Sequence, residues 1–352
     1  MTDAGRSPAH RVARVALVVV GVLVVAELGA RLLGPYLPTP ELYADASTAV
    51  KVEQLDALPA DDDCDRVVLV GSSMTRDDLV PAAMRPSVDD GVVVYNAALD
   101  AASPTLTRGW LDDHVIARAE PDLVVLGLAS FDLNDAASLP EAALDSYREA
   151  PLTRSDLLGT LQEPFITHSA LVRHRSALRD PVELWGGIGD LLAGDRAERP
   201  GPEGLDGLLD ADGAGLSRRD LSYVPSASGT ALVEQELLND FSIDGAQVAA
   251  LQSLIEDLRS DGIDVALVAL PVTTDYVAAH PDGAADQDAF LDALRSVAEA
   301  TDVPMVDLHD AVEDPGFADT HHLAGEAADD LSRRLPDLLA EAGVARPGCS
   351  GA

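Results

Sequence analysis

Short apolar runs recur along the chain and alternate with longer segments in which apolar residues follow a helical period. The runs predict buried strands at Arg66–Val70, Val92–Tyr95, Asp122–Leu128, Ile263–Leu270 and Pro304–Leu308. The longer segments predict helices at Pro104–Arg118, Ala246–Arg259, Gln287–Glu299 and Gly325–Ala342. Continuous apolar runs are typical of strands buried on both faces, and their alternation with helices favours a parallel sheet. The pattern therefore predicts a three-layer α/β fold with helices on both faces of a five-stranded parallel sheet.

A further apolar segment, Val12–Leu33, precedes the first predicted strand. As a helix it is about 33 Å long, enough to span a hydrocarbon core of about 30 Å. Arg residues precede the segment and acidic residues dominate after it, which places the N-terminus in the cytoplasm and the rest outside. A cleaved signal peptide is the alternative, because the uncharged run Val15–Ala26 is short. We favour a single-pass anchor in the cell membrane with an extracytoplasmic domain, and both interpretations export that domain.

These signals predict the organisation of the chain. We expect a cytoplasmic tail at 1–11, a transmembrane signal-anchor helix at 12–33, a linker at 34–63, a catalytic-type domain at 64–345 and a tail at 346–352. The domain carries an insertion at about 140–245, because the stretch between the third and fourth strands is too long for a simple crossover. Cys64 and Cys349 are the two cysteines of the chain. They lie near the two ends of this domain, and a disulfide between them is a hypothesis compatible with an oxidising compartment.

The charge of the chain excludes some partners. A net charge of −37 repels phosphate backbones, so we expect no nucleic acid partner. Asp210–Gly215 is similar to a calcium-binding loop, but Ala214 and Leu221 stand where that loop needs ligands. The remaining histidines and cysteines show no ligand spacing, and we therefore expect neither a metal nor another cofactor.

Two short segments carry residues suited to nucleophilic catalysis. Gly71-Ser72-Ser73 follows the first strand, and Asp319-Thr320-His321-His322 lies between the last strand and the last helix. In a parallel sheet both segments lie at the carboxyl edge, where such folds place their sites. Ser73 would be the nucleophile, His322 its general base, and Asp319 the residue that orients the imidazole. Ser72 or a plain turn serine, and His321 or a helix-capping histidine, are the alternatives.

Both segments resemble the first and last sequence blocks of the SGNH/GDSL hydrolases. The resemblance implies a flavodoxin-like fold and two further site residues. Tyr95–Ala101 is similar to the second block, in which a glycine N–H contributes to the oxyanion hole; Ala101 stands at that position. The third block has Gly-x-Asn-Asp, whereas this chain has Ala129–Asp132 and lacks the Asn, so we expect Asn134 to replace it as a donor.

The resemblance also implies a function. We expect an extracytoplasmic serine esterase that forms an acyl-serine intermediate and removes O-acyl groups from a glycan or lipid. An O-acyltransferase that uses the same triad, and a catalytically degenerate module that binds the cell envelope, are the alternatives.

Overall fold

The computed structural model describes residues 8–37, 46–59, 63–150, 169–174, 178–179, 181–194, 209–243 and 245–349. The chain forms two compact units. One comprises residues 1–42 and 154–202, and the other comprises residues 43–153 and 203–352. The predicted insertion is therefore divided between the two units.

The larger unit contains a five-stranded, fully parallel sheet. Its strands are β1 (Arg66–Gly71), β2 (Val93–Asn96), β3 (Leu123–Leu128), β4 (Asp264–Ala269) and β5 (Met305–Asp307). Their spatial order is β2-β1-β3-β4-β5, so the direction of winding reverses between β1 and β3. This order confirms the predicted α/β fold with a five-stranded parallel sheet, and the carboxyl ends of β1 and β3 are where such folds place their sites.

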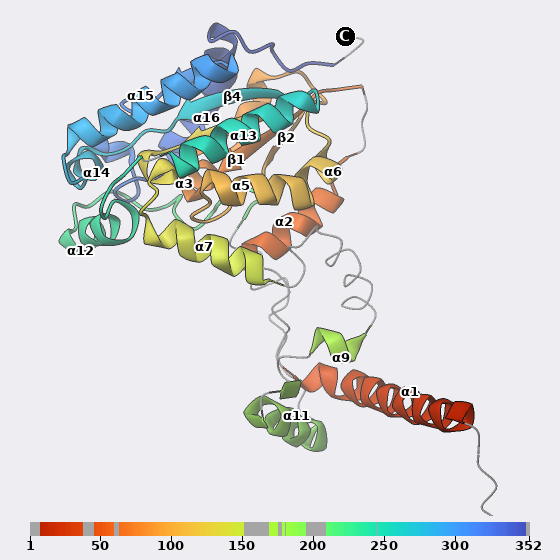
Figure 1. Ribbon diagram of the computed structural model, residues 1–352. Helices are drawn as coiled ribbons and strands as arrows, with labels where there is room; N and C mark the ends of the chain where they lie inside the picture. Colours follow the sequence, from red (N-terminus) through yellow and green to blue (C-terminus); the bar gives the residue numbers. More distant parts are fainter. Residues whose placement is uncertain are drawn as a thin grey trace, which may run out of the picture. The chain divides into compact units, whose positions relative to one another are not determined.

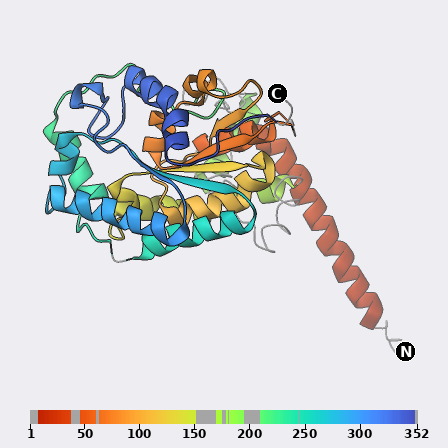
Figure 2. The same cartoon turned by 90° about the horizontal axis from the view of Figure 1, so that it is seen from above.

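Helices cover both faces of the sheet, as Figures 1 and 2 show. Alternate strand residues face opposite layers: Val68 and Val70 enter one core, whereas Val67 and Leu69 enter the other. The first core includes side chains of α2 (Ala46–Asp56), α5 (Pro104–Trp110), α13 (Ala246–Ser260) and α15 (Ala284–Thr301). The second includes side chains of α3 (Ser73–Asp78), α4 (Pro81–Met84), α14 (Thr274–Ala278) and α16 (Gly325–Glu341). Burial on both faces explains why the strands are continuously apolar.

The four predicted helices are present with small changes at their ends. The first continues from α5 through a π-helical turn, Leu111–Val115, into α6 (Ile116–Ala119). The other helical segments are η1 (Gly34–Tyr36), η2 (Arg85–Ser87), η4 (Ser130–Leu133), α7 (Ser138–Glu149), α9 (Ala170–Arg173), α11 (Pro181–Ala193), α12 (Ala227–Leu232), the π-helical η6 (Val233–Leu237) and η7 (Asp314–Gly316).

Helix α2 lies inside the stretch 34–63 that we predicted to be a linker, and this prediction is corrected. Val52 and Leu55 are buried in the core beside β1. Lys51, the only lysine of the chain, is also buried, and its Nζ donates to the carbonyls of Asn96 (2.5 Å) and Gly213 (2.6 Å). The apolar residues on one face of this short helix pack against the sheet, so the fold begins before Cys64.

The two ends of the larger unit are joined. Cys64 and Cys349 form a disulfide across 285 residues of sequence. Asp65 N–H donates to the carbonyl of Gly348 at 2.9 Å, and Gly348 N–H donates to Asp65 Oδ2 at 2.9 Å. Residues up to Cys349 therefore belong to the fold, although we predicted that the tail begins at 346.

The smaller unit contains α1 (Pro8–Leu33), α9 and α11. Leu33 and Leu37, at the end of α1 and just after it, pack against Leu184 and Ile188 of α11. The membrane-spanning helix that we predicted at Val12–Leu33 falls within α1. In the part of the chain that the structure describes, no helix combines the length and the apolarity that crossing a membrane requires.

Candidate active site

The turn between β1 and α3 presents Ser73 at the carboxyl edge of the sheet. Gly71 has a φ of +149°, and a Cβ there would lie 2.3 Å from both the Gly127 carbonyl and Thr75 Oγ1. Only glycine fits this close approach. Ser73 is the first residue of α3, so its N–H has no partner within the helix. The turn therefore directs a hydroxyl and a backbone donor toward the same side of the sheet.

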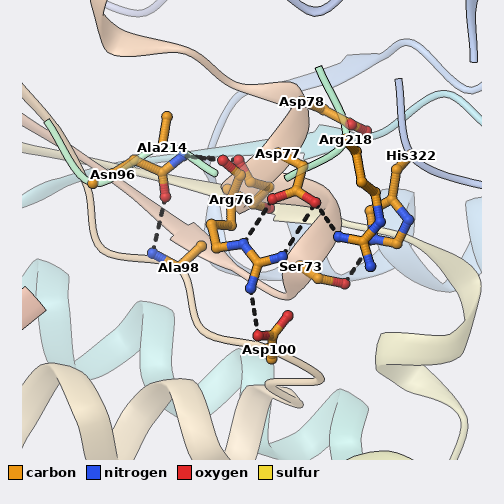
Figure 3. A network of polar contacts seen from close by, with 12 residues as sticks. Ser73, Arg76, Asp77, Asp78, Asn96, Ala98, Asp100, Ala214, Arg218 and His322 are labelled. Carbon is orange, nitrogen blue, oxygen red and sulfur yellow. Dashed lines mark hydrogen bonds and ion pairs between the residues drawn. The ribbon is translucent and has the colours of Figure 1, made fainter. Parts of the chain in front are cut away.

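Ser73, His322 and Asp319 form a hydrogen-bonded chain. His322 Nε2 lies 2.9 Å from Ser73 Oγ, and His322 Nδ1 lies 2.9 Å from Asp319 Oδ2. Figure 3 shows Ser73 facing His322. Asp319 Oδ1 also accepts from the backbone N–H groups of His321 (3.0 Å) and His322 (2.9 Å), which fixes the carboxylate against its own turn. The structure thus brings together the three residues that the sequence singled out.

Burial and hydrogen bonding set the charge of Asp319. Burial alone would raise the pKa of this carboxyl, but the hydrogen bond and the charge of His322, with contributions from His321, lower it well below its ordinary value. Asp319 is therefore ionised throughout the neutral range. An ionised carboxylate holds His322 with a proton on Nδ1, which leaves Nε2 to accept the serine proton.

The geometry distinguishes Ser73 and His322 from Ser72 and His321, their neighbours in the sequence. Ser72 is fully buried, and its hydroxyl is directed to Asp132 Oδ2 at 3.4 Å. His321 Nδ1 lies 3.0 Å from Thr320 Oγ1, and burial lowers the pKa of His321 to about 3, so its ring is neutral at pH 7. Neither residue is placed to activate Ser73, and His321 instead packs beside the ring of His322 with centroids 4.1 Å apart.

Ala101 lies in the loop that follows β2 and adopts a left-handed backbone with φ +50°. Leu99 N–H donates to the Gly71 carbonyl at 3.1 Å, which holds this loop against the end of β1. Trp110 Nε1 anchors the same loop by donating to the Ala97 carbonyl at 2.8 Å. Among the described residues the N–H of Ala101 has no backbone hydrogen-bond partner.

Asn134 does not serve as the predicted donor, and this prediction is corrected. Its Nδ2 donates to the carbonyl of Leu237 at 2.8 Å and lies 3.5 Å from that of Asn239. Its Oδ1 accepts from the N–H groups of Ser242 (2.9 Å) and Ala136 (3.1 Å). The amide is thus fully engaged in holding the segment around residues 237–242. Phe131 occupies the place where the third block has its Asn.

A buried acid supports the loop that carries Phe131. Asp132 Oδ2 accepts from Ala129 N–H at 2.7 Å, and within the described chain its Oδ1 has no partner. Burial raises the pKa of Asp132 to about 8, against the opposing effect of the hydrogen bonds from Ala129 and Ser72. The carboxyl is therefore largely protonated at neutral pH. Its role is structural, because it binds its own loop and the residue beside Ser73.

An ionic network beside the triad was missed at the sequence level. Arg76 Nε donates to Asp77 Oδ1 at 2.7 Å, and the same guanidinium pairs with Asp100. Arg218 pairs with Asp77, and its Nε lies 3.2 Å from Asp319 Oδ2. Figure 3 shows Arg218 reaching the same side of Asp77 as His322. Arg76 and Asp77 follow Ser73 by three and four positions in the sequence, whereas nothing near Arg218 in the sequence indicates its position.

Among the residues that the structure describes, Asp319, His321 and His322 form the group whose geometry could hold a metal ion. One ligand atom from each lies within 4.8 Å of the others. Both ring nitrogens of His322 already face hydrogen-bond partners, Ser73 and Asp319. A metal at this place would have to displace the bonds that join the triad, so the arrangement suits proton transfer better than metal binding.

Comparisons with known proteins give structural similarity at low sequence identity. No protein-family model and no curated protein matches the sequence. A GDSL-like lipase from Bacteroides thetaiotaomicron is 12% identical, with a TM-score of 0.41 over 84% of this chain and 98% of its own. An acetyl xylan esterase is 11% identical, with a TM-score of 0.41 over 79% and 100%. A psychrotrophic esterase from Pseudoalteromonas is 9% identical, with a TM-score of 0.36 over 79% and 97%.

Proposed function

We propose that this chain is a serine esterase of the SGNH type, with Ser73 as nucleophile, His322 as general base and acid, and Asp319 as the orienting carboxylate. The observation that carries the proposal is the unbroken path from Ser73 Oγ through His322 to Asp319, with both hydrogen bonds at 2.9 Å. An alcohol is a poor nucleophile at neutral pH, and a positioned imidazole is what activates it.

The reaction follows from this geometry. Ser73 Oγ attacks the acyl carbonyl while its proton passes to His322 Nε2, and the carbonyl electron pair moves onto oxygen. The N–H groups of Ser73 and Ala101 bind that oxyanion. The intermediate collapses by breaking the bond to the alcohol, which takes the proton from His322. Water then attacks the acyl-serine with His322 again acting as base, and the carboxylic acid and free Ser73 are released.

The oxyanion hole has two backbone donors in this proposal and lacks the Asn side chain of the resembled family. Removing one such donor from a hydrolase lowers kcat by about 10²–10³-fold. We therefore expect slow turnover of simple aryl esters. A substrate that supplies additional binding energy away from the ester would recover part of the rate.

The substrate that fits best is a small O-acyl group on an uncharged glycan or lipid. The net charge of −37 disfavours the approach of anionic polymers. The purified protein is to be assayed for acetate release from an O-acetylated neutral oligosaccharide, with Ser73→Ala as control. Release by the wild type alone supports the proposal, whereas equal release by the variant would refute it.

Two alternatives are outcomes of the same assay. Acetate that appears on an added sugar acceptor instead of in solution would identify an O-acyltransferase, because the acyl-serine would react with a hydroxyl other than water. Binding of the oligosaccharide without release or transfer would identify a binding module, for which the missing block-three Asn is the supporting observation.

The site of action that we propose is outside the cytoplasm. The Cys64–Cys349 disulfide supports this placement, because such bonds persist in oxidising compartments and are rare in the cytosol. The Arg-flanked apolar segment at the N-terminus supports export. Protease treatment of intact cells, followed by membrane fractionation, tests the proposal. Digestion of the larger unit supports external placement, and a membrane-bound or released product distinguishes an anchor from a cleaved signal peptide.

A further inference from the structure

Arg218 reaches the triad from the inserted segment, where a tight loop positions it. Asp210 Oδ1 accepts from the N–H groups of Asp212 (2.9 Å) and Ala214 (2.8 Å), which closes the loop upon itself. Gly215 N–H donates to the Arg76 carbonyl at 2.9 Å. A Cβ at Gly215 would lie 1.9 Å from Asp77 Oδ1, so the backbone itself packs against the ionic network. The loop is thus built to lie against α3.

A second set of contacts fixes this loop to β2. Asn96 N–H donates to the Asp212 carbonyl at 2.8 Å. The buried Lys51 joins the carbonyls of Asn96 and Gly213. Because the loop is held from two sides, Arg218, which follows the loop, has a defined position. The Arg218 side chain is 30% exposed.

Arg218 lies between two carboxylates that both act on His322. It pairs with Asp77, which is 3% exposed, and its Nε lies 3.2 Å from the same Asp319 oxygen that faces His322 Nδ1. Burial would raise the pKa of Asp77, but the hydrogen bonds and charge of Arg76, with the charges of His322 and Arg218, lower it, so Asp77 is ionised. The Arg218 guanidinium therefore orients the Asp319 carboxylate and compensates the charge of Asp77.

The position of the Asp319 carboxylate depends on Arg218. Among the described residues, Arg218 is the arginine that contacts both Asp77 and Asp319. Without Arg218, these two carboxylates would lose the cation that they share. Asp319 would then be held by the N–H groups of its own turn and by His322.

We infer that Arg218 is a positioning residue of the site: from the inserted segment it holds the Asp319 carboxylate against His322 and cancels the charge of Asp77. The inference rests on the proposed function. It adds that the inserted segment is part of the catalytic apparatus, and that docking of the 209–218 loop sets the position of the carboxylate that orients the general base.

The test compares Arg218→Gln, Arg218→Lys and the control Arg219→Gln in the full chain. Arg219 is adjacent in the same loop but pairs with Asp329, at 2.7 Å to each oxygen, away from the triad. The first measurement is the NMR chemical shift of the His322 Nδ1 proton, identified by its loss in His322→Gln. This proton lies in the hydrogen bond to Asp319, and we expect its resonance to move upfield or to be lost in Arg218→Gln. Arg218→Lys should restore most of the shift, and Arg219→Gln should leave it unchanged.

The second measurement is the rate of reaction with a fluorophosphonate at pH 7, which the proposed function requires. We expect this rate to fall about tenfold or more in Arg218→Gln, because the base would be less well positioned. The same Nδ1 proton resonance in Arg218→Gln and Arg219→Gln would overturn the inference whether or not the wild type reacts. A wild type that does not react, with the expected change of the Nδ1 proton resonance intact, would instead count against the proposed function.

Discussion

His322 Nε2 lies within hydrogen-bond distance of Ser73 Oγ, at 2.9 Å, although 249 residues separate the two in the sequence. The parallel sheet produces this contact, because β1 and β5 both deliver the following residues to the carboxyl edge. The strand order then determines which loops meet. The functional proposal depends on this relationship, and the predictions below examine the groups around it.

Ala101→Gly should raise stability without loss of activity. A left-handed backbone is strained for alanine and free of strain for glycine, so the free energy of unfolding should rise by about 0.5–1 kcal/mol. The N–H that we propose as an oxyanion donor is retained, and the rate should stay within about twofold. Asp302→Gly, at φ +52° and away from the site, is the matched control for the backbone effect. A loss of stability in Ala101→Gly, or a tenfold loss of rate, would contradict the interpretation.

Asn134→Ala should lower stability far more than catalysis. The substitution leaves the Leu237 carbonyl and the Ser242 N–H without their partner, and we expect a loss of about 2 kcal/mol or more in unfolding free energy. The rate per folded molecule should change by less than about threefold, because a lost oxyanion donor would cost about 10²–10³-fold. Asn239→Ala, with an exposed side chain in the same segment, is the control. A hundredfold loss of rate would instead indicate that Asn134 is a donor of the oxyanion hole.

Asp132→Asn should remove part of the pH dependence of folding. The pKa of Asp132 is raised to about 8 in the folded protein, so the folded state keeps a proton that the unfolded chain releases above its ordinary value of 3.8. Stability therefore falls as the pH rises from about 4 to about 8, by up to about 1.4 kcal/mol per pH unit. Denaturant unfolding at pH 5 and pH 8 should show a smaller loss for the variant than for the wild type. Equal losses would show that Asp132 is ionised in the fold.

The Cys64–Cys349 disulfide should contribute substantially to stability, because it closes almost the whole larger unit into one loop. Replacing both cysteines by alanine should lower the free energy of unfolding by about 2–5 kcal/mol. Dithiothreitol should lower the melting temperature of the wild type and leave that of the variant unchanged. A melting temperature of the wild type that does not respond to reductant would show that the bond adds nothing to the folded state.

The sequence predicted the parts of the fold that follow from local patterns. Buried parallel strands are continuously apolar, so β1 to β5 were visible as short runs, and the sheet edge then located Ser73 and His322. Helix α2 was hidden because it lies between Pro-rich and acidic stretches. It also carries a buried lysine, Lys51, whose burial depends on carbonyls supplied by distant residues.

The remaining errors have a common physical origin in long-range contacts. Asn134 was predicted from its distance along the loop, but its amide is engaged by the segment around Leu237, 103 residues away. Arg218 reaches Asp77 across 141 residues from a loop without periodicity. Contacts of this kind depend on how an insertion folds back on the domain, and no local pattern of residues encodes them.

The most direct test of the proposed mechanism is covalent labelling of the full chain with a fluorophosphonate at pH 7. We predict that the wild type gains one phosphonyl group, located on Ser73 by peptide mass spectrometry. Ser73→Ala and His322→Ala should remain unlabelled at the same exposure, whereas Ser72→Ala should label like the wild type. Absence of labelling in a folded wild type, or labelling that persists in Ser73→Ala, would contradict the account.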